Sequence, residues 1–268
     1  GENTTAAIAS GDETEIYAAS TINGNGANAT AFDVSGGARL FNQYQGVVEL
    51  SGSNSTGARV HDGGNFINRG SMHIASGIGI DVSSGYGQYV PVDSALRVDD
   101  GIAAMRVGSG AWMKIYGDGQ GYSVMQANGS ADGLLLDVGA EGFEADNITI
   151  GAYGSGSAIN NRAETPNINL DNVRLEVANG NGIRSATSFN SAGSVQINVS
   201  GSGTGYRFEN ANGSITRNDL VIGSDYSIVV TGTGNGVIAN TRGNVISQGW
   251  IYILAANGGS AIATQIAN

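Results

Sequence analysis

Short segments that open on a small residue and continue into apolar side chains recur along this chain of 268 residues. Three of them read GNGIRSAT, GTGYRFEN and GNGVIANT, and they follow one another at intervals of 23 and 31 residues. The full series of opening residues is Ala31, Gly57, Gly79, Gly101, Gly121, Gly156, Gly182, Gly205, Gly236 and Gly259. One such unit has an apolar face and nothing to pack it against, so units must stack on each other. The sequence therefore predicts a solenoid of about ten coils.

Alternation of apolar and polar residues with a period of two precedes most of the opening residues. The alternating apolar residues are Val48/Leu50, Met72/Ile74, Met113/Ile115, Ile148/Ile150, Val173/Leu175/Val177, Val195/Ile197/Val199 and Ile251/Ile253. Such alternation is typical of a strand with one buried face and one outer face. Together with corners rich in glycine and asparagine, it predicts an all-β fold, a parallel β-helix with loop inserts.

Two other architectures match part of this pattern. A leucine-rich repeat has coils of similar length, but its leucine and asparagine ladder is absent. An antiparallel sandwich or barrel stays open, because Asn23-Gly24, Asn128-Gly129 and Asn179-Gly180 could each form a tight hairpin turn. In a β-helix the same pairs would form corners, since both residue types tolerate positive φ.

Departures from the regular coil length divide the chain. Residues 1–28 have weak periodicity and are predicted to form an N-terminal cap or leading coil. Residues 29–268 are predicted to form the β-helix, as a fragment of a longer one. The long steps from Gly121 and Gly205 open almost identically, with GYSVMQANGS and GYRFENANGS. We expect loop inserts near 81–97, 126–147 and 212–225.

The charge balance restricts the partners. The net charge is −11 and Lys114 is the single lysine, which argues against nucleic acid or anionic lipid, since phosphate binding needs basic groups. No apolar run approaches the length of about 18 residues that a membrane span needs, so we expect no membrane insertion by this segment. Cysteine is absent and charged residues make up only 13% of the chain. A long, polar, uncharged flank is suited to hydrogen bonds with glycans or with another copy of the chain.

The small-residue segments, together with strands such as GSVQINVSGSG and WIYILAANGG, resemble the passenger domains of bacterial autotransporters. In particular they are similar to right-handed parallel β-helical adhesins of Gram-negative outer membranes, of the pectin-lyase-like type, over roughly residues 20–268. The resemblance implies display at the cell surface and attachment to a downstream outer-membrane β-barrel. It also implies attachment to a host or matrix protein or glycan, or cell–cell self-association and biofilm formation.

A protein that binds or degrades polysaccharide is the main alternative, because such enzymes also use parallel β-helices. A glycosidase needs carboxylates that converge on one face, whereas the adjacent Asp99 and Asp100 are expected at a glycine corner. His61 and His73 are expected on the surface, without further metal ligands. The GDGQG at 117–121 is a single copy without the aspartate spacing of a calcium repeat. We therefore predict no enzymatic activity, no cofactor and no bound metal.

Two tyrosines are candidate ligand-binding residues because of the segment in which they lie. Tyr86 and Tyr89 stand in SSGYGQYVPVDSAL, where Pro91 interrupts the coil pattern and predicts a projecting loop. Exposed tyrosines offer flat apolar area with a polar tip, a common feature of binding surfaces. The alternative is that both rings fold back over the apolar edge of the rod.

Trp112 and Tyr116 complete the candidate ligand-binding residues. Both alternate with apolar residues of a predicted strand, so their rings are expected on its outer face together with Lys114. This would give an exposed aromatic stripe with a cation between the rings.

Overall fold

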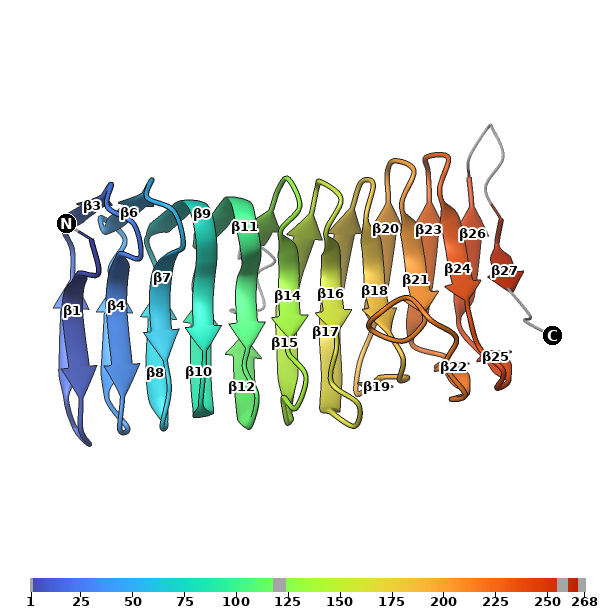
Figure 1. The fold of residues 1–268 in the computed structure, drawn as a ribbon, viewed down its shortest axis with the longest axis horizontal. Helices are drawn as coiled ribbons and strands as arrows, with labels where there is room; N and C mark the ends of the chain where they lie inside the picture. The colour runs from blue at the N-terminus through green and yellow to red at the C-terminus, as the bar shows by residue number, and fades with distance from the viewer. Residues whose placement is uncertain (1, 118–123, 255–259, 265–268) are drawn as a thin grey trace.

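The chain winds into a parallel β-solenoid of about ten turns (Figure 1). The computed structural model describes residues 2–117, 124–254 and 260–264. Within these residues there is no helix, and strands pair in parallel with the strands one turn before and one turn after. The predicted all-β parallel helix is confirmed. The hairpin alternative is wrong, because a hairpin would pair neighbouring strands antiparallel.

The strands form three faces, and each turn visits face 1, then face 2, then face 3. Face 1 contains β1 (Thr5–Ser10), β4 (Thr30–Ser35), β7 (Ser55–Val60), the second halves of β9 (Ser71–Val82) and β11 (Ala95–Val107), β14 (Asp132–Leu136), β16 (Ser157–Asn161), β18 (Asn181–Ser185), β21 (Thr204–Phe208), β24 (Asn235–Ala239) and β27 (Ile262–Thr264). Face 2 contains β2 (Glu15–Ala18), β5 (Arg39–Asn42), β8 (Gly64–Asn68), β10 (Gly85–Pro91), β12 (Ala111–Tyr116), the first halves of β15 (Gly142–Ala152) and β17 (Asn167–Val177), β19 (Asn190–Ser191), β22 (Leu220–Ile222) and β25 (Val245–Ser247). Face 3 contains β3 (Thr21–Gly24), β6 (Val47–Leu50), the first halves of β9 and β11, β13 (Val124–Ala127), the second halves of β15 and β17, β20 (Val195–Val199), β23 (Tyr226–Val230) and β26 (Trp250–Ile253).

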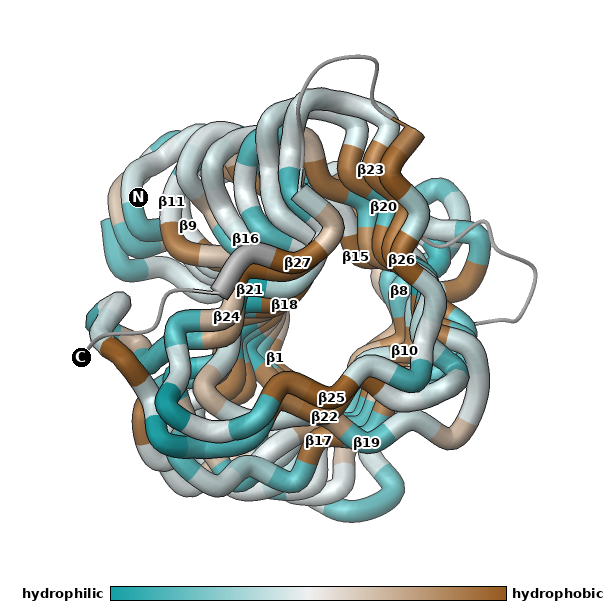
Figure 2. The backbone as a smooth tube through the Cα atoms, turned by 90° about the vertical axis from the view of Figure 1, so that its right-hand side faces the viewer, coloured by the Kyte–Doolittle hydropathy of each residue, from teal (hydrophilic) through white to brown (hydrophobic). Residues whose placement is uncertain are grey.

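The inner side of every face is apolar. In β12, for example, Met113 and Ile115 are fully buried, while Trp112, Lys114 and Tyr116, which alternate with them, are partly exposed. Viewed along the axis, hydrophobic segments of all three faces border the centre of the coil (Figure 2). Buried residues from Ala9 to Ala239 form one continuous core. Stacking of turns therefore buries the apolar face that a single unit would leave in water.

Corners with positive φ let a strand continue from one face onto the next. β15 and β17 pass from face 2 to face 3 at Asn147 (φ 52°) and Asn172 (φ 51°). β9 passes from face 3 to face 1 at Gly77 (φ 143°), where an added Cβ would lie 2.0 Å from the backbone oxygen of Ser55. These corners use glycine and asparagine in the way that the sequence predicts.

The register of face 1 corrects several predicted opening residues. In-register positions define what we call the small-residue column, which comprises Ala31, Gly57, Gly79, Ala104, Gly133, Ala158, Gly182, Gly205, Gly236 and Ala261. Gly101 and Gly156 do not belong to it, because they precede Ala104 and Ala158 by three and two residues. Gly121 and Gly259 lie outside the described residues. The similarity of GYSVMQANGS to GYRFENANGS is also misleading, since the first places β13 on face 3 and the second places β21 on face 1.

Two of the three predicted inserts are wrong. Segment 81–97 contains the regular strand β10, which pairs with β8 and β12. Segment 126–147 contains β14 and the start of β15, both in register with neighbouring turns. The third insert is confirmed in part: the chain leaves face 1 after Phe208 and reaches face 2 only at Leu220. The intervening segment, here called loop 209–219, lies in front of face 1 and is drawn in orange in Figure 1.

The first turn of the solenoid consists of β1, β2 and β3. Each of these strands pairs in register with the corresponding strand of the second turn. Most side chains of this turn are exposed or partly exposed, in contrast to the buried interior of the turns that follow. Within the predicted N-terminal segment 1–28, residues 5–24 thus form a complete coil.

Candidate binding surface

Tyr86 and Trp112 form a stacked pair on the outer side of face 2. Tyr86 of β10 is in register with Trp112 of β12, so the two side chains stand one turn apart, at the strand spacing of about 4.8 Å. Their ring centroids are 5.3 Å apart and the ring planes differ by 16°. Tyr86 is 38% exposed and Trp112 is partly exposed. The predicted outward position of Trp112 is confirmed, and the pair presents flat aromatic area to solvent.

Lys114 and Tyr116 extend this surface along β12. Both side chains point outward, because they alternate with buried residues of the strand. The Lys114 ammonium lies 4.5 Å from the centre of the Tyr116 ring and 3.3 Å from the Glu144 carboxylate of the next turn. A cation over an aromatic ring contributes about 0.5–1 kcal/mol at an exposed site. The cation and the ring therefore hold each other in place on the outer side of the rod.

A second aromatic group lies on face 2 nearer the N-terminus. Tyr17 of β2 and Phe41 of β5 stack with their centroids 4.6 Å apart and their planes 7° apart. The Arg69 guanidinium lies 6.0 Å from the Phe41 centroid and 5.8 Å from that of Tyr44. The outward positions in register with Tyr17 and Phe41 on the following turns of face 2 are occupied by Ile67, Val90 and Tyr116.

Sequence reasoning missed the pair of Tyr17 and Phe41. The two residues are in register and 24 residues apart, close to the length of one coil. Two aromatic residues at that spacing are the sequence feature from which the pair could have been predicted. We call the surface formed by the outward aromatic residues of face 2 the aromatic face; its members are Tyr17, Phe41, Tyr86, Trp112 and Tyr116.

Tyr89 does not belong to this surface, which corrects the expected projecting loop. Its side chain is fully buried, and its ring centroid lies 5.9 Å from that of Phe66 in the preceding turn. Asn68 Nδ2 approaches the Tyr89 hydroxyl at 3.5 Å. Burial raises the pKa of Tyr89 to about 12, although the hydrogen bonds with Asn68 and Ser94 oppose the change. Tyr89 is a core residue and presents nothing to a ligand.

His61 lies between two carboxylates on the outer side of face 1. Its Nδ1 is 2.8 Å from Asp62 Oδ2, and its Nε2 is 3.0 Å from Asp33 Oδ1 in the preceding turn. Burial alone would lower the pKa of His61, but the hydrogen bonds to the two carboxylates outweigh burial and raise it. Since both nitrogens face acceptors, the arrangement favours the doubly protonated, positive imidazolium.

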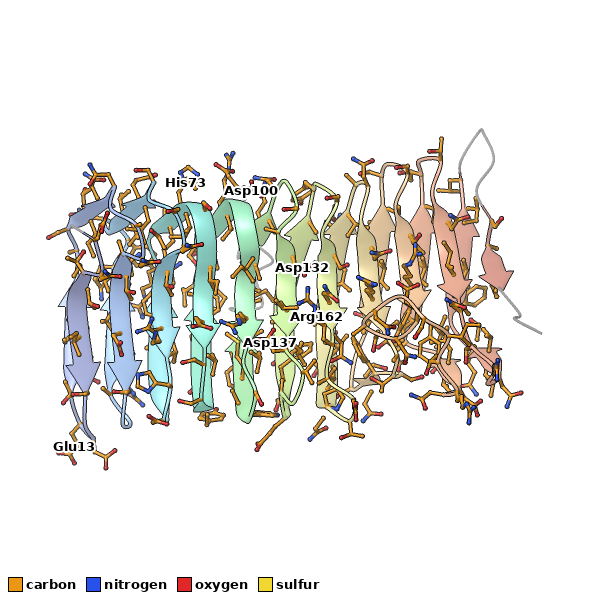
Figure 3. The ribbon with its side chains drawn as sticks, viewed as in Figure 1. Glu13, His73, Asp100, Asp132, Asp137 and Arg162 are labelled. Atoms are coloured by element: carbon orange, nitrogen blue, oxygen red, sulfur yellow. The ribbon has the colours of Figure 1, made fainter. Side chains whose placement is uncertain are left out.

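His73 repeats this arrangement on the outer side of face 3 (Figure 3). Its Nδ1 is 2.8 Å from Glu49 Oε2 and its Nε2 is 2.6 Å from Asp99 Oδ2, so it joins three successive turns. Burial opposes the charge, but the hydrogen bonds to Asp99 and Glu49 outweigh it and raise the pKa of His73. Both histidines therefore form ion pairs that link neighbouring turns, and each ring nitrogen has a carboxylate partner.

We expect the thermal stability of the rod to fall as the pH rises from about 6 to about 8.5. The pKa of an unfolded histidine is about 6.5, and both folded values lie above it. The stabilisation is therefore complete below about pH 6.5 and is lost as the pH rises through the folded pKa values. Circular dichroism melts at the two pH values measure this, and the double variant His61→Gln/His73→Gln should show a flatter dependence. A wild-type Tm that stays constant or rises with pH would contradict the assignment.

The acidic pair Asp99–Asp100 consists of two carboxylates with separate structural partners. Burial alone would raise the pKa of Asp99, but hydrogen bonds from His73 and two further side chains outweigh it and lower the pKa to about 2. Asp100 accepts hydrogen bonds from the backbone N–H of Gly101 at 2.9 Å and from Ser130 Oγ at 3.1 Å. The predicted corner position is confirmed. Asp99 is ionised at neutral pH, which is the wrong state for a general acid.

No group of three or more histidine and carboxylate side chains is arranged to hold a metal ion in the described part of the chain. Residues 118–121 of the GDGQG segment lie outside that part, so the expectation about calcium is not tested. A helix long and apolar enough to cross a membrane is absent from residues 2–117, 124–254 and 260–264.

Comparison of the chain with protein-family models, with curated proteins and with solved structures found no match. The architecture and its surface chemistry are therefore the basis for a functional proposal.

Proposed function

We propose that the chain is the passenger domain of a surface-displayed bacterial adhesin, and that it acts by binding rather than by catalysis. The parallel solenoid is compatible with a β-helical passenger, and the repeat segments resemble those of autotransporter adhesins. Backbone hydrogen bonds between turns keep the faces of such a rod in fixed register. A rod of this kind carries its binding residues away from the cell surface without needing a folded binding pocket.

The aromatic face is the observation that carries the proposal. Tyr86 and Trp112 stack on the outside of the rod, where they add nothing to the core. Exposed aromatic rings on a rigid surface are typical of interfaces, because they bury much area at little cost in conformational entropy. The apolar C–H side of a sugar ring can pack on such rings, while Lys114 and Glu144 can bond hydroxyl groups. We propose that a glycan or protein of the host or matrix binds here.

Replacing Trp112 by alanine is expected to weaken ligand binding about tenfold or more. Loss of a central aromatic contact of about 1.4 kcal/mol or more corresponds to that factor. The measurement is binding of the purified chain to an array of glycans and matrix proteins, repeated with Trp112→Ala and with Tyr86→Ala. Tyr153→Ala is the matched control for Tyr86→Ala. Both tyrosines are 38% exposed, but Tyr153 follows β15 at the end of face 3 and lies outside the aromatic face. Equal losses in the control and the test variants would contradict a role for the aromatic face.

Self-association is the second form of the proposed adhesion, and cells that display the chain distinguish the two. Clumping of these cells without array binding would identify homotypic adhesion, in which many weak contacts add along the rod. Array binding without clumping would identify a host or matrix ligand. Release of new reducing ends from a polysaccharide would contradict the non-enzymatic proposal and favour polysaccharide degradation instead.

A further inference from the structure

Three arginines of the described residues have neither a carboxylate within 4.0 Å nor an aromatic ring beneath them: Arg162, Arg217 and Arg242. The other described cationic side chains are matched, seven arginines and Lys114 by carboxylates and Arg69 by two aromatic rings. In a chain of net charge −11 with 23 carboxylates, unmatched cations are the exception. Their common position is therefore informative.

All three line hollows on the two sides of loop 209–219. The hollow on the C-terminal side has a volume of about 540 Å³ and is lined by Gly213, Ser214, Ile215, Arg217, Asn240 and Arg242. The hollow on the N-terminal side, of about 360 Å³, is lined by residues that include Arg162, Glu164 and Asn212. Arg162 lies on the side of the rod that faces the viewer in Figure 3.

The backbone places Arg217 and Arg242 one above the other. Thr216 and Thr241 form a parallel bridge, and the Arg242 N–H donates to the Thr216 oxygen at 3.0 Å. The residues after the bridge therefore stand in adjacent turns, about 4.8 Å apart. Two guanidinium groups in this arrangement repel each other unless an anion lies between them.

Hydrogen bonds to the neighbouring turns hold the loop in place. Asn218 Nδ2 donates to the backbone oxygen of Ala186 at 2.8 Å, and Asn240 Nδ2 donates to that of Gly213 at 3.1 Å. Arg184 Nη2 donates to the backbone oxygen of Ala211 at 3.3 Å. Both hollows thus have walls that are built before a ligand arrives, which reduces the entropic cost of binding.

The charge distribution of the rod favours an anion at this place. Residues 1–179 contain 20 of the 23 carboxylates and 8 of the 12 lysines and arginines, whereas residues 180–268 contain three carboxylates and four arginines. The Glu209 carboxylate is already engaged by Arg184 and Arg207. Glu164 lines the smaller hollow. The buried Asp132 carboxylate also interacts electrostatically with Arg162, but it accepts hydrogen bonds from the Ser157 N–H and from Asn160 Nδ2. Arg217 and Arg242 lie in this last third of the rod, where an anionic ligand is repelled least, and Arg162 lies shortly before it.

We propose that the two hollows bind one acidic saccharide chain, which crosses loop 209–219. Arg217 and Arg242 would hold one carboxylate or sulfate between them, through the paired N–H donors of guanidinium. Arg162 would hold a second anionic group. The register places Arg162 three turns before Asn240, about 14 Å along the rod, so only an extended chain reaches both hollows. The polar side chains of Asn212 and Ser214 lie between them and can bond sugar hydroxyls. This site is separate from the aromatic face and does not depend on its proposed function.

Calorimetric titration of the full chain with defined probes tests the proposal. The probes are an oligogalacturonate and a heparin oligosaccharide, each of six and of two sugars, maltohexaose as the neutral chain, a single-stranded oligonucleotide, and sodium sulfate as the free anion. We expect one or both acidic chains to bind and to weaken at raised salt concentration, with no detectable binding of maltohexaose. The variant Arg217→Gln/Arg242→Gln should weaken binding at least tenfold, and Arg162→Gln about threefold for six sugars but not for two.

Controls separate this site from general electrostatics and from other exposed side chains. Arg174→Gln removes the same charge from a paired arginine of face 3 and should change the affinity less than twofold. Tyr153→Ala, which removes an exposed ring outside both this site and the aromatic face, should also leave the affinity unchanged. Unchanged melting of the exposed arginine variants verifies their fold. Equal binding by all variants, binding of maltohexaose, binding of sulfate as tight as that of the chains, or tighter binding of a single-stranded oligonucleotide would overturn the proposal.

Discussion

Replacing Tyr89 by alanine is expected to lower the free energy of unfolding by about 3–5 kcal/mol, the range for truncation of a buried aromatic side chain. The ring is fully buried, stacks next to Phe66 and closes the inner side of β10. The cavity would open between two turns that depend on each other for burial, because each turn packs only on its neighbours. Urea denaturation followed by circular dichroism measures the loss.

Two matched variants sharpen this test. Tyr89→Phe keeps the ring and removes only the hydroxyl near Asn68, which should cost about 1 kcal/mol. Tyr86→Ala, three residues away in the same strand, removes a partly exposed ring of equal size and should cost clearly less than Tyr89→Ala. A Tyr89→Ala protein as stable as the Tyr86→Ala protein would contradict the buried position.

The sequence already contained the information that Tyr86 and Tyr89 do not share a surface. Tyr86 and Tyr89 are separated by three positions, an odd number, so within one strand they must point to opposite sides. Pro91 favoured a loop, but it is the last residue of β10 and the backbone bond to Asn68 comes from Val92, at 2.8 Å. A proline at the end of a strand removes no bond that the sheet needs. The spacing was therefore the better guide than the proline.

The outward residues of β12 could be predicted because their position depends only on local alternation. Trp112, Lys114 and Tyr116 lie outside for the same reason that Met113 and Ile115 lie inside. This rule needs no knowledge of neighbouring turns.

Stacking partners need the register between turns, and the register follows from the lengths of the corners. Along face 1 the successive steps range from 22 residues, between Thr56 and Ile78, to 31, between Tyr206 and Val237. Because the step length varies, an opening residue chosen from the sequence can lie two or three residues away from the true in-register position, as Gly101 and Gly156 do. The stack of Tyr86 on Trp112 and the arginine pair at loop 209–219 could not be found without it.

The small-residue column gives a second large expected effect. A Cβ added at Gly205 would lie 2.3 Å from Ile228 Cγ2 and 2.6 Å from the backbone oxygen of Gly236. Both distances are far below contact, so the face 3 strand of the same turn and the face 1 strand of the next turn must shift. The same match between a column glycine and a β-branched isoleucine on face 3 of the same turn occurs in four pairs: Gly133–Ile150, Gly182–Ile197, Gly205–Ile228 and Gly236–Ile251. We expect Gly205→Ala to lower the free energy of unfolding by about 1–3 kcal/mol, the usual cost of overpacking.

The solenoid itself supplies the compensating change. Ala158 belongs to the column, and the residue on face 3 of its turn that corresponds to Ile228 is Leu175, which has no methyl group on Cβ; both Ala158 and Leu175 are fully buried. Ile228→Leu alone should cost less than about 1.5 kcal/mol. In the double variant the Cγ2 methyl is gone, so the combined cost should fall below the sum of the single costs by about 1 kcal/mol. Urea denaturation of the four proteins measures this coupling. Strict additivity would mean that the backbone oxygen of Gly236, and not the isoleucine branch, is what requires glycine in the column.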